Sequence, residues 1–263
     1  MTLSFCSFSS GSSGNCYLVK SDETAVLIDA GISCKKITDG LVKTKTNLDH
    51  LKALLVTHEH SDHVGGVRAT IKKLKGISVY AKEETFSNLN LKITDDRKKV
   101  LKSGESFKIN DLTIEAFSVS HDVETVGYHI RYEDRQISIV TDTGKLSKDI
   151  LNKLADADIL VIEANHDVNM LKSGSYPPFL KRRILGDEGH LSNEASGNYI
   201  ADLMKVKNKA RCILLAHLSS ENNDPETAEQ TVINILEENN WYNGQDVYVK
   251  SIKRDELSVI YEI

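Results

Sequence analysis

Four side chains that can bind metal ions lie close together in the segment VTHEHSDHVGGV. They are His58, His60, Asp62 and His63. Imidazole nitrogens and a carboxylate oxygen, without a thiolate, suit Zn²⁺, Mn²⁺ or an iron ion, and the choice among these ions stays open. Such a dense set of donors predicts a metal site in this segment.

The patterns on either side of this segment show how its donors could converge. A short apolar, partly β-branched run precedes His58 and is typical of a buried strand, and a helical pattern follows Val64 after two glycines. The donors therefore lie on a loop between a strand and a helix, where side chains can converge without disrupting a sheet.

Three further donors, His121, Asp142 and His217, each follow an apolar run at the carboxyl end of an expected strand. Seven nitrogen and oxygen donors exceed what one tetrahedral or octahedral ion needs, so the sequence predicts two divalent ions. The expected assignment gives His58, His60 and His121 to one ion and Asp62, His63 and His217 to the other, with Asp142 bridging them.

Composition excludes few functions. The chain has 263 residues and a net charge of −5, so no global basic field attracts nucleic acid, although bound cations would reverse the charge locally. The apolar runs are far shorter than the roughly 20 residues that cross a membrane, and the first residues do not resemble a signal peptide. The short apolar runs predict that the protein has no membrane partner. Four cysteines without CxxC spacing favour reduced thiols in a cytoplasmic protein. No pattern indicates the oligomeric state.

Alternating apolar patterns and turn residues indicate two strand-rich halves, each followed by helices. The simplest organisation is one α/β domain over residues 1–263, with two sheets packed face to face and helices outside. The first half is expected to hold strands Thr2–Phe8, Cys16–Lys20, Thr24–Asp29, Lys52–Thr57 and Ile77–Tyr80, and helices Lys35–Val42 and Val64–Leu74. The second half is expected to hold strands Ser106–Ile109, Leu112–Ser118, Thr125–Tyr132, Gln136–Thr141, Ile159–Glu163 and Cys212–Ala216, helices Leu146–Leu154, Asn193–Met204 and Pro225–Glu238, a stretch broken by Pro177 and Pro178, and two closing strands.

The spacing H-x-H-x-D-H from His58 to His63, with later single His, Asp and His residues, resembles the hallmark of the metallo-β-lactamase superfamily. The resemblance runs from Asp29, in VLIDAG, to His217. It implies a four-layer αββα sandwich with a dinuclear site at the edge of the two sheets. It also implies that Asp29 orients the metal loop without binding an ion itself.

Differences between this sequence and the motifs of other branches indicate which branch of the superfamily it resembles. Asp142 stands where the commonest zinc β-lactamases use Cys, and His60 stands where flavodiiron proteins use a carboxylate. The segments LVIEANHD and DEGHLSNEAS resemble motifs of phosphodiesterase branches such as tRNase Z, whose Glu and His form an acid pair; here these are Glu163 and His190. The spacings leave no room for the long arm of tRNase Z or the extra domain of β-CASP nucleases. The compact form most resembles the YycJ (WalJ)-like branch, whose members are regarded as metal-dependent hydrolases and proposed DNA exonucleases.

The residues and the resemblance together predict a dinuclear metal-dependent phosphodiesterase, a nuclease that acts on DNA more than on RNA. Two adjacent cations would lower the pKa of a bridging water toward roughly 7, and the resulting hydroxide would attack phosphorus. His190, held by Glu163, would stabilise a phosphate oxygen or protonate the leaving alcohol, and Asp62 is expected to act in catalysis as well as in metal binding.

Substrate contacts are expected just before and just after His190. The segment YPPFLKRR combines basic side chains with an aromatic ring, which suits phosphate contact and base stacking, and a helix start after His190 favours an anion. The loop SSGSSG near the amino terminus is either a plain turn or a cradle of N–H groups for an anion. The expected substrate-binding residues are Phe179, Lys181, Arg182, Arg183, Ser192 and Asn193.

Thioester or lactone hydrolysis of the glyoxalase II type is the alternative, because it uses the same seven ligands. The Glu163–His190 pair and the lack of an obvious thiol-cofactor module argue against it. A metal-stabilised binding protein without activity is a third possibility, which the complete ligand set disfavours.

Overall fold

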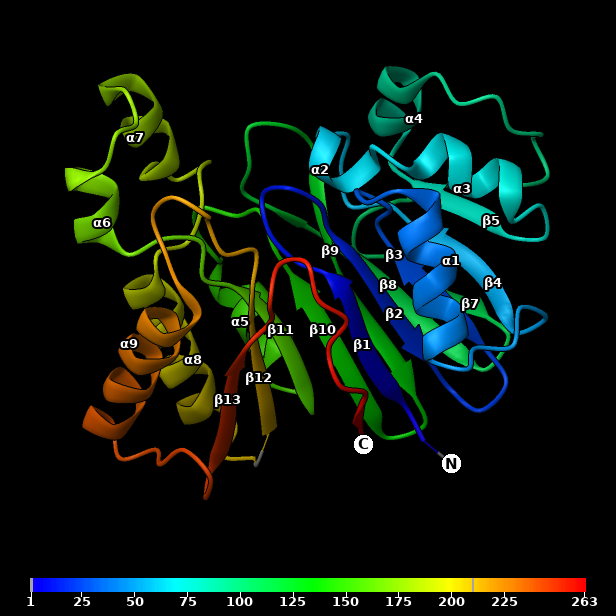
Figure 1. Ribbon diagram of the computed structural model, residues 1–263. Coiled ribbons are helices and arrows are strands. Elements are labelled where there is room, and N and C mark those ends of the chain that lie inside the picture. Colours follow the sequence, from blue (N-terminus) through cyan, green and yellow to red (C-terminus); the bar gives the residue numbers. More distant parts are fainter. Residues whose placement is uncertain (1, 210) are drawn as a thin grey trace.

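Two seven-stranded sheets pack face to face at the centre of the computed structural model, which describes residues 2–209 and 211–263 (Figure 1). The first sheet has the order β14-β1-β2-β3-β4-β5-β6, and the second has the order β13-β12-β11-β10-β9-β8-β7. The strands of the first sheet are β1 (Ser4–Ser9), β2 (Cys16–Lys20), β3 (Ala25–Ile28), β4 (Leu51–Leu55), β5 (Ser78–Ala81), β6 (Lys98–Val100) and β14 (Tyr261–Glu262). Those of the second are β7 (Ser106–Ile109), β8 (Leu112–Val119), β9 (Thr125–Tyr132), β10 (Arg135–Val140), β11 (Ile159–Glu163), β12 (Arg211–Ala216) and β13 (Val247–Ser251).

Both sheets follow one plan, with antiparallel strands at one side and parallel strands at the other. β1, β2 and β3 pair antiparallel, and β4 to β6 continue in parallel. In the second sheet β7 to β10 form an antiparallel meander, and β11 to β13 continue in parallel. Asn110 and Glu133 have left-handed backbones at the two tight turns of the meander, where the sequence predicts turns.

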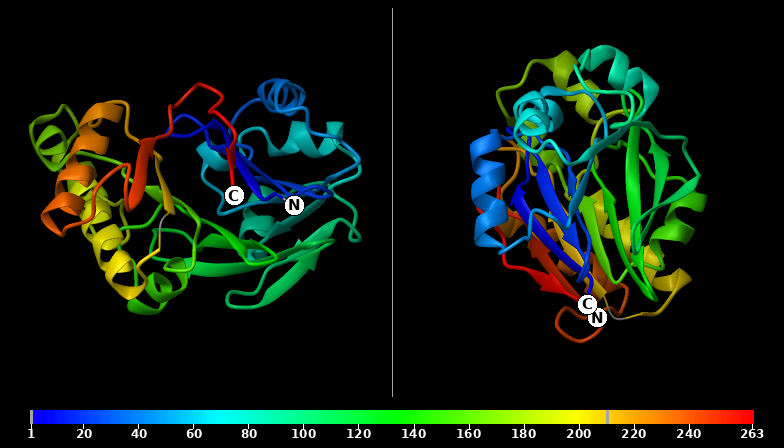
Figure 2. Two further views of the ribbon diagram at one scale, coloured as in Figure 1. Left: turned by 90° about the horizontal axis from the view of Figure 1, so that it is seen from below. Right: turned by 90° about the vertical axis from the view of Figure 1, so that its right-hand side faces the viewer.

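Helices cover the outer faces of both sheets, which confirms the predicted αββα sandwich (Figure 2). Side chains such as Ser33, Ser192 and Asp224 accept hydrogen bonds from first-turn N–H groups and so fix where helices begin. No helix in the described ranges is long and apolar enough to cross a membrane. The helices are α1 (Cys34–Lys43), α2 (Ser61–Val64), α3 (Val67–Lys73), α4 (Glu83–Leu89), α5 (Lys148–Leu154), α6 (Val168–Ser173), α7 (Pro178–Ile184), α8 (Asn193–Val206) and α9 (Pro225–Glu238).

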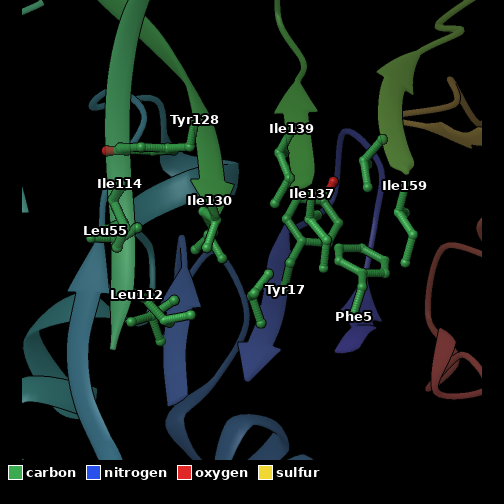
Figure 3. Packing of buried hydrophobic residues seen from close by; sticks show 14 of the residues in the cluster. Phe5, Tyr17, Leu55, Leu112, Ile114, Tyr128, Ile130, Ile137, Ile139 and Ile159 are labelled. Atoms are coloured by element: carbon green, nitrogen blue, oxygen red, sulfur yellow. The ribbon is translucent and has the colours of Figure 1, made fainter. Parts of the chain in front are cut away.

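The central core fills the space between the sheets (Figure 3). Phe5 and Tyr17 from the first sheet and Tyr128 and Ile137 from the second are fully buried in it. Each such side chain contributes about 1.5–3 kcal/mol through burial. The hydroxyl of Tyr128 donates to the Val56 carbonyl at 2.7 Å and so ties the second sheet to the strand end that precedes the metal loop.

The predicted helix Val64–Leu74 is present as α3, but it begins later, at Val67, because the chain breaks between α2 and α3. The N–H of Gly66 donates to the Ala30 carbonyl at 2.7 Å instead of to its own helix. This contact turns the chain, so α2 carries the metal motif and α3 starts a new direction.

Four helices and one strand lack a counterpart among the predicted elements, and one of them is α2, where a loop was expected. α4 and β6 lie in a polar segment without a clear period, and α6 and α7 lie on either side of the predicted proline break. Pro178 occupies the first turn of α7, where a missing N–H costs nothing, so it starts this helix instead of ending one.

Backbone contacts hold the metal loop against two other loops, the one before β2 and the one after β3. The N–H of Asn15 donates to the Asp62 carbonyl at 2.7 Å, and the N–H of Ala30 donates to the His63 carbonyl at 2.9 Å. Gly31 passes so close that an added Cβ atom would lie 1.7 Å from the Asp62 carbonyl oxygen. Only glycine fits at this position while the loop keeps its place.

We expect Gly31→Ala to destabilise the protein by about 2–3 kcal/mol, because the new methyl group overpacks backbone against backbone. Its metal content should fall as well, since Asp62 must move. Gly76→Ala is the matched control, because a Cβ atom there meets nothing within 4 Å. Urea denaturation and metal analysis check the pair, and equal stability of the two variants would contradict the close approach of Gly31 to Asp62.

Candidate metal centre and active site

The seven predicted ligands meet at one edge of the sandwich because each follows the carboxyl end of a strand or lies on the loop after it. His58 comes after β4, His121 after β8, Asp142 after β10 and His217 after β12. The remaining three, His60, Asp62 and His63, lie at the start of α2.

Three residues of the site have left-handed backbones, although none is glycine. Asp29 has φ 59°, Asp142 has φ 55° and His217 has φ 56°. This conformation turns the chain sharply where a strand ends and directs the side chain across the sheet edge. It costs about 1–3 kcal/mol at each position and persists only where surrounding structure enforces it, which is typical of functional sites.

The side chains form the two predicted ligand sets. Donor atoms of His58, His60 and His121 lie within 4.8 Å of one another, and so do those of Asp62, His63 and His217. Asp142 lies between the sets: its Oδ2 is 3.2 Å from His63 Nε2 and its Oδ1 is 3.5 Å from His217 Nε2. A carboxylate in this place can bridge two ions.

Asp29 makes the contacts that its expected orienting role requires. Its Oδ2 accepts from His63 Nδ1 at 2.7 Å, and its Oδ1 accepts from the Thr57 N–H at 2.8 Å. The Thr57 hydroxyl also lies 2.9 Å from His58 Nδ1. Asp29 and Thr57 therefore hold the outer nitrogens of two histidines, so that the Nε2 atoms face the centre.

The donors fit divalent metal ions. His58 Nε2 is buried and has no hydrogen-bond partner among residues 2–209 and 211–263. Burial holds the pKa of His58 well below its ordinary value, so this imidazole is neutral, as a ligand must be. A buried neutral nitrogen without a partner is costly unless an ion uses it.

Glu163 is fully buried at the end of β11 and joins both halves of the site. Its Oε1 accepts from His190 Nδ1 and from His217 Nδ1, each at 2.8 Å. Its Oε2 accepts from the N–H groups of Thr143 at 3.0 Å and Leu191 at 3.1 Å. Burial opposes ionisation of the Glu163 carboxyl, but the two histidines outweigh it and lower the pKa to about 2.

His190 is partly buried beside this cluster, with 16% of its side chain exposed. Burial alone would lower the pKa of its imidazole, but the Glu163 carboxylate outweighs burial and raises the pKa above its ordinary value. Because Nδ1 faces Glu163, Nε2 is free to act on a bound molecule.

A pocket of about 230 Å³ opens onto these groups. Ser12 of the SSGSSG loop lines one part of the wall, and side chains around α7 line another. The pocket is lined by Ser12, His60, Asp62, Asp142, Asn165, Tyr176, Leu180, Arg183, Ile184, His190, His217 and Ser219.

Asp122 is a site residue that the sequence analysis missed. Its Oδ1 lies 3.4 Å from His60 Nε2 and 3.3 Å from His121 Nε2, and its Oδ2 accepts from Arg183 Nε at 2.9 Å. Partial burial raises the pKa of this carboxyl, but Arg183 and the histidines outweigh it and lower the pKa below its ordinary value. The available signal was its place directly after His121.

Only some of the expected substrate-binding residues on α7 line a pocket in the structure. Arg183 reaches the pocket, and Arg182 lines a neighbouring pocket with Lys145. Phe179 is 67% exposed on α7. Lys181 instead donates to backbone carbonyls at the end of α6 and so serves the packing of α6 against α7.

Ser192 and Asn193 are not brought to the metal cluster as substrate contacts. The Ser192 hydroxyl accepts from the Ala195 N–H and caps α8. Asn193 is fully buried, and its amide exchanges two hydrogen bonds with Asn223. The expected contact through Asn193 is corrected to a structural role, because no polar atom of it is free.

Comparison with known proteins agrees with this geometry. A family model described as the β-lactamase superfamily domain matches residues 24–217. The chain is 38% identical to exodeoxyribonuclease WalJ of Streptococcus pneumoniae (97% of this chain, 96% of the relative) and 38% identical to exodeoxyribonuclease YycJ of Bacillus anthracis (93% of each).

Other similarities are weaker. A hydroxyacylglutathione hydrolase of Buchnera aphidicola is 31% identical over 41% of this chain and 39% of its own length. The crystal structure of the short form of human tRNase Z has a TM-score of 0.61 at 16% identity, with 98% of each chain covered, and shows the shared fold. From the family model and from the two relatives that match almost end to end, we conclude that the chain belongs to the β-lactamase superfamily, as a metal-dependent hydrolase beside WalJ and YycJ.

Proposed function

We propose that this protein is a dinuclear metal-dependent exodeoxyribonuclease. The observation that carries the proposal is Glu163, which holds both a metal ligand, His217, and a free acid, His190, at the same pocket. The two relatives named as exodeoxyribonucleases support DNA as the substrate. A cytoplasmic location belongs to the proposal, and the four unpaired cysteines support it.

Two divalent ions (Zn²⁺, Mn²⁺ or iron) would be held by the two ligand sets, with Asp142 between them. When bound, such ions supply a water of lowered pKa and neutralise charge on phosphate oxygens. Asp29, Thr57 and Glu163 keep the ligand nitrogens aimed at the centre. The chain thus provides a rigid frame in which donor positions are fixed before substrate arrives.

His190 is the proton donor in this proposal. When a phosphodiester is hydrolysed, one ester oxygen leaves as an alkoxide. An alkoxide is a poor leaving group, so protonation of this oxygen helps as the P–O bond breaks. The Glu163 carboxylate fixes the His190 ring through Nδ1 and stabilises its charged form. The proton on Nε2 can then pass to the leaving oxygen in the pocket.

Thioester hydrolysis is the alternative, and it shares the ligand set. Thioester hydrolysis would not need His190 as a proton donor, because a thiolate leaves without protonation. The hydroxyacylglutathione hydrolase similarity also covers under half of the chain. A contrast between leaving groups separates the two functions.

We expect the wild-type protein to bind two ions per chain at saturation and Asp142→Ala to bind fewer. Activity of this variant should fall by about 10²-fold or more, because the bridging carboxylate is lost. Asp39→Ala, an exposed site on α1, is the control and should match the wild type. Metal analysis of a single ion in the saturated wild type, or full turnover by Asp142→Ala, would contradict the dinuclear site.

We expect His190→Ala to keep both ions and the fold but to lose about 10²-fold or more in rate on a diester with an alkoxide leaving group. On bis-p-nitrophenyl phosphate the loss should be much smaller, because p-nitrophenolate leaves without protonation. The two rates are measured on the same metal-loaded preparation. Equal losses on both esters would remove His190 as the acid and favour the thioesterase alternative.

We expect the double variant Arg182→Ala/Arg183→Ala to bind single-stranded DNA more weakly and with a flatter salt dependence, since fewer counterions are released. The loss should be larger on DNA than on bis-p-nitrophenyl phosphate. Lys35→Ala/Lys43→Ala, on the exposed side of α1, removes the same charge and is the control. If the double variant behaves as this control does, α7 has no part in binding DNA.

A further inference from the structure

A second cationic pocket lies on α3, outside the site described above. It has a volume of about 400 Å³ and is lined by Arg68, Ile71, Lys72, Lys75, Lys92 and Arg97. All of these except Ile71 are cations. We call this feature the α3 pocket.

The charges of the α3 pocket are available to a ligand. Within the described ranges, no carboxylate pairs with Arg68, Lys72, Lys75 or Lys92, although nearby lysines have partners: Lys82 pairs with Glu124 and Lys98 with Glu83. The side chains of the four cations without a carboxylate partner are all exposed. Four unpaired cations around one hollow repel one another, and an anion relieves that repulsion.

Arg97, which lines the α3 pocket, is held in place by backbone carbonyls. Its guanidinium donates to the carbonyls of Ile77 at 2.8 Å and of Ile71 and Leu74 at 3.1 Å each. Arg68 similarly donates to the Leu89 carbonyl at 2.6 Å. Two of the cations are therefore anchored to backbone, so that part of the positive surface is ordered before a ligand binds.

The segment that forms the α3 pocket carries a net positive charge, whereas the whole chain carries a net negative charge. Residues 67–102 contain ten lysines and arginines against four acidic residues, whereas the whole chain has 33 against 38. Asp95 and Asp96 in the neighbouring loop reduce this excess but do not cancel it. A polyanion would thus be attracted to this region and not to the protein as a whole.

The helix that carries part of the α3 pocket follows the metal loop closely in the chain. α3 begins four residues after His63, and its seven residues span about 10 Å. Figure 1 shows α2 in the upper middle of the molecule, with α3 to one side and α7 on the other. The helices that carry these two groups of cations, α3 and α7, therefore lie on opposite sides of α2.

We propose that the α3 pocket binds the phosphate backbone of a polynucleotide strand whose reactive end lies at the metal centre. This inference rests on the proposed nuclease function and extends it. The α3 pocket and the pocket at the metal centre share no lining residue, so a strand must extend beyond the scissile phosphate to contact both. The pocket would secure strands of several nucleotides and contribute little to the shortest ones.

The test uses the triple variant Arg68→Ala/Lys72→Ala/Lys75→Ala, which leaves the structural Arg97 in place. The control is Lys35→Ala/Lys43→Ala/Lys148→Ala, which removes the same charge from exposed sites elsewhere. Binding of a labelled 20-nucleotide phosphorothioate strand to the metal-loaded proteins is measured by fluorescence anisotropy across a salt series. Cleavage of a 20-nucleotide strand and of a trinucleotide is measured in parallel.

The triple variant should bind the long strand about tenfold or more weakly than the control, and its salt slope should fall by about 2, or 0.7 per lost phosphate contact. Its loss in kcat/KM should be larger on the long strand than on the trinucleotide. A triple variant that matches the control on the long strand overturns the inference, even if the wild type cleaves DNA. If the wild type does not cleave DNA but the triple variant still loses binding, the nuclease function fails while the α3 pocket stands as a polynucleotide surface.

Discussion

The site depends on one buried carboxylate. A fully buried ionised Glu163 would cost several kcal/mol unless its oxygens were satisfied, and four N–H donors satisfy them. Those donors come from the end of β10, from the end of β12 and from the segment after α7. The ionised Glu163 carboxylate is therefore stable only when the fold brings these three distant parts of the chain together around it. The same contacts fix the rings of His217, the candidate ligand, and His190, the proposed acid, so one carboxylate orients both side chains.

The fold offsets the cost of this assembly with apolar burial. Left-handed backbones at Asp29, Asp142 and His217 and a close-packed Gly31 are unfavourable locally, and all four lie where a strand or its loop reaches the metal edge. Beneath them the core between the sheets buries Phe5, Tyr17, Tyr128 and their neighbours. A sandwich with two such sheets holds its edge rigid, which is why strained residues can persist there.

The candidate metal ligands could be predicted because His58, His121, Asp142 and His217 are polar residues close after apolar strands, and strand ends of a sandwich meet at one edge. The other three candidates belong to the closely spaced motif that follows His58. Asp122 escaped notice because a second polar residue after His121 looks like an ordinary turn, and its contacts with His60 and Arg183 are set by tertiary packing alone. Lys181 and Asn193 were assigned to substrate because charge and polarity are visible in a sequence whereas burial is not. In the structure, backbone carbonyls and Asn223 take up those polar groups. Gly65 and Gly66 were visible as helix-breaking residues, but the break between α2 and α3 is made by a long-range contact with Ala30.

The negative charge of the chain constrains how a polyanion can reach the site. Attraction must come from local features, because the protein as a whole repels a negative strand weakly. Arg182 and Arg183 on α7, the α3 pocket on the other side, and cations held between them would form a positive strip across the sheet edge. Such an arrangement favours a strand that lies across the metal edge over one that contacts any other face.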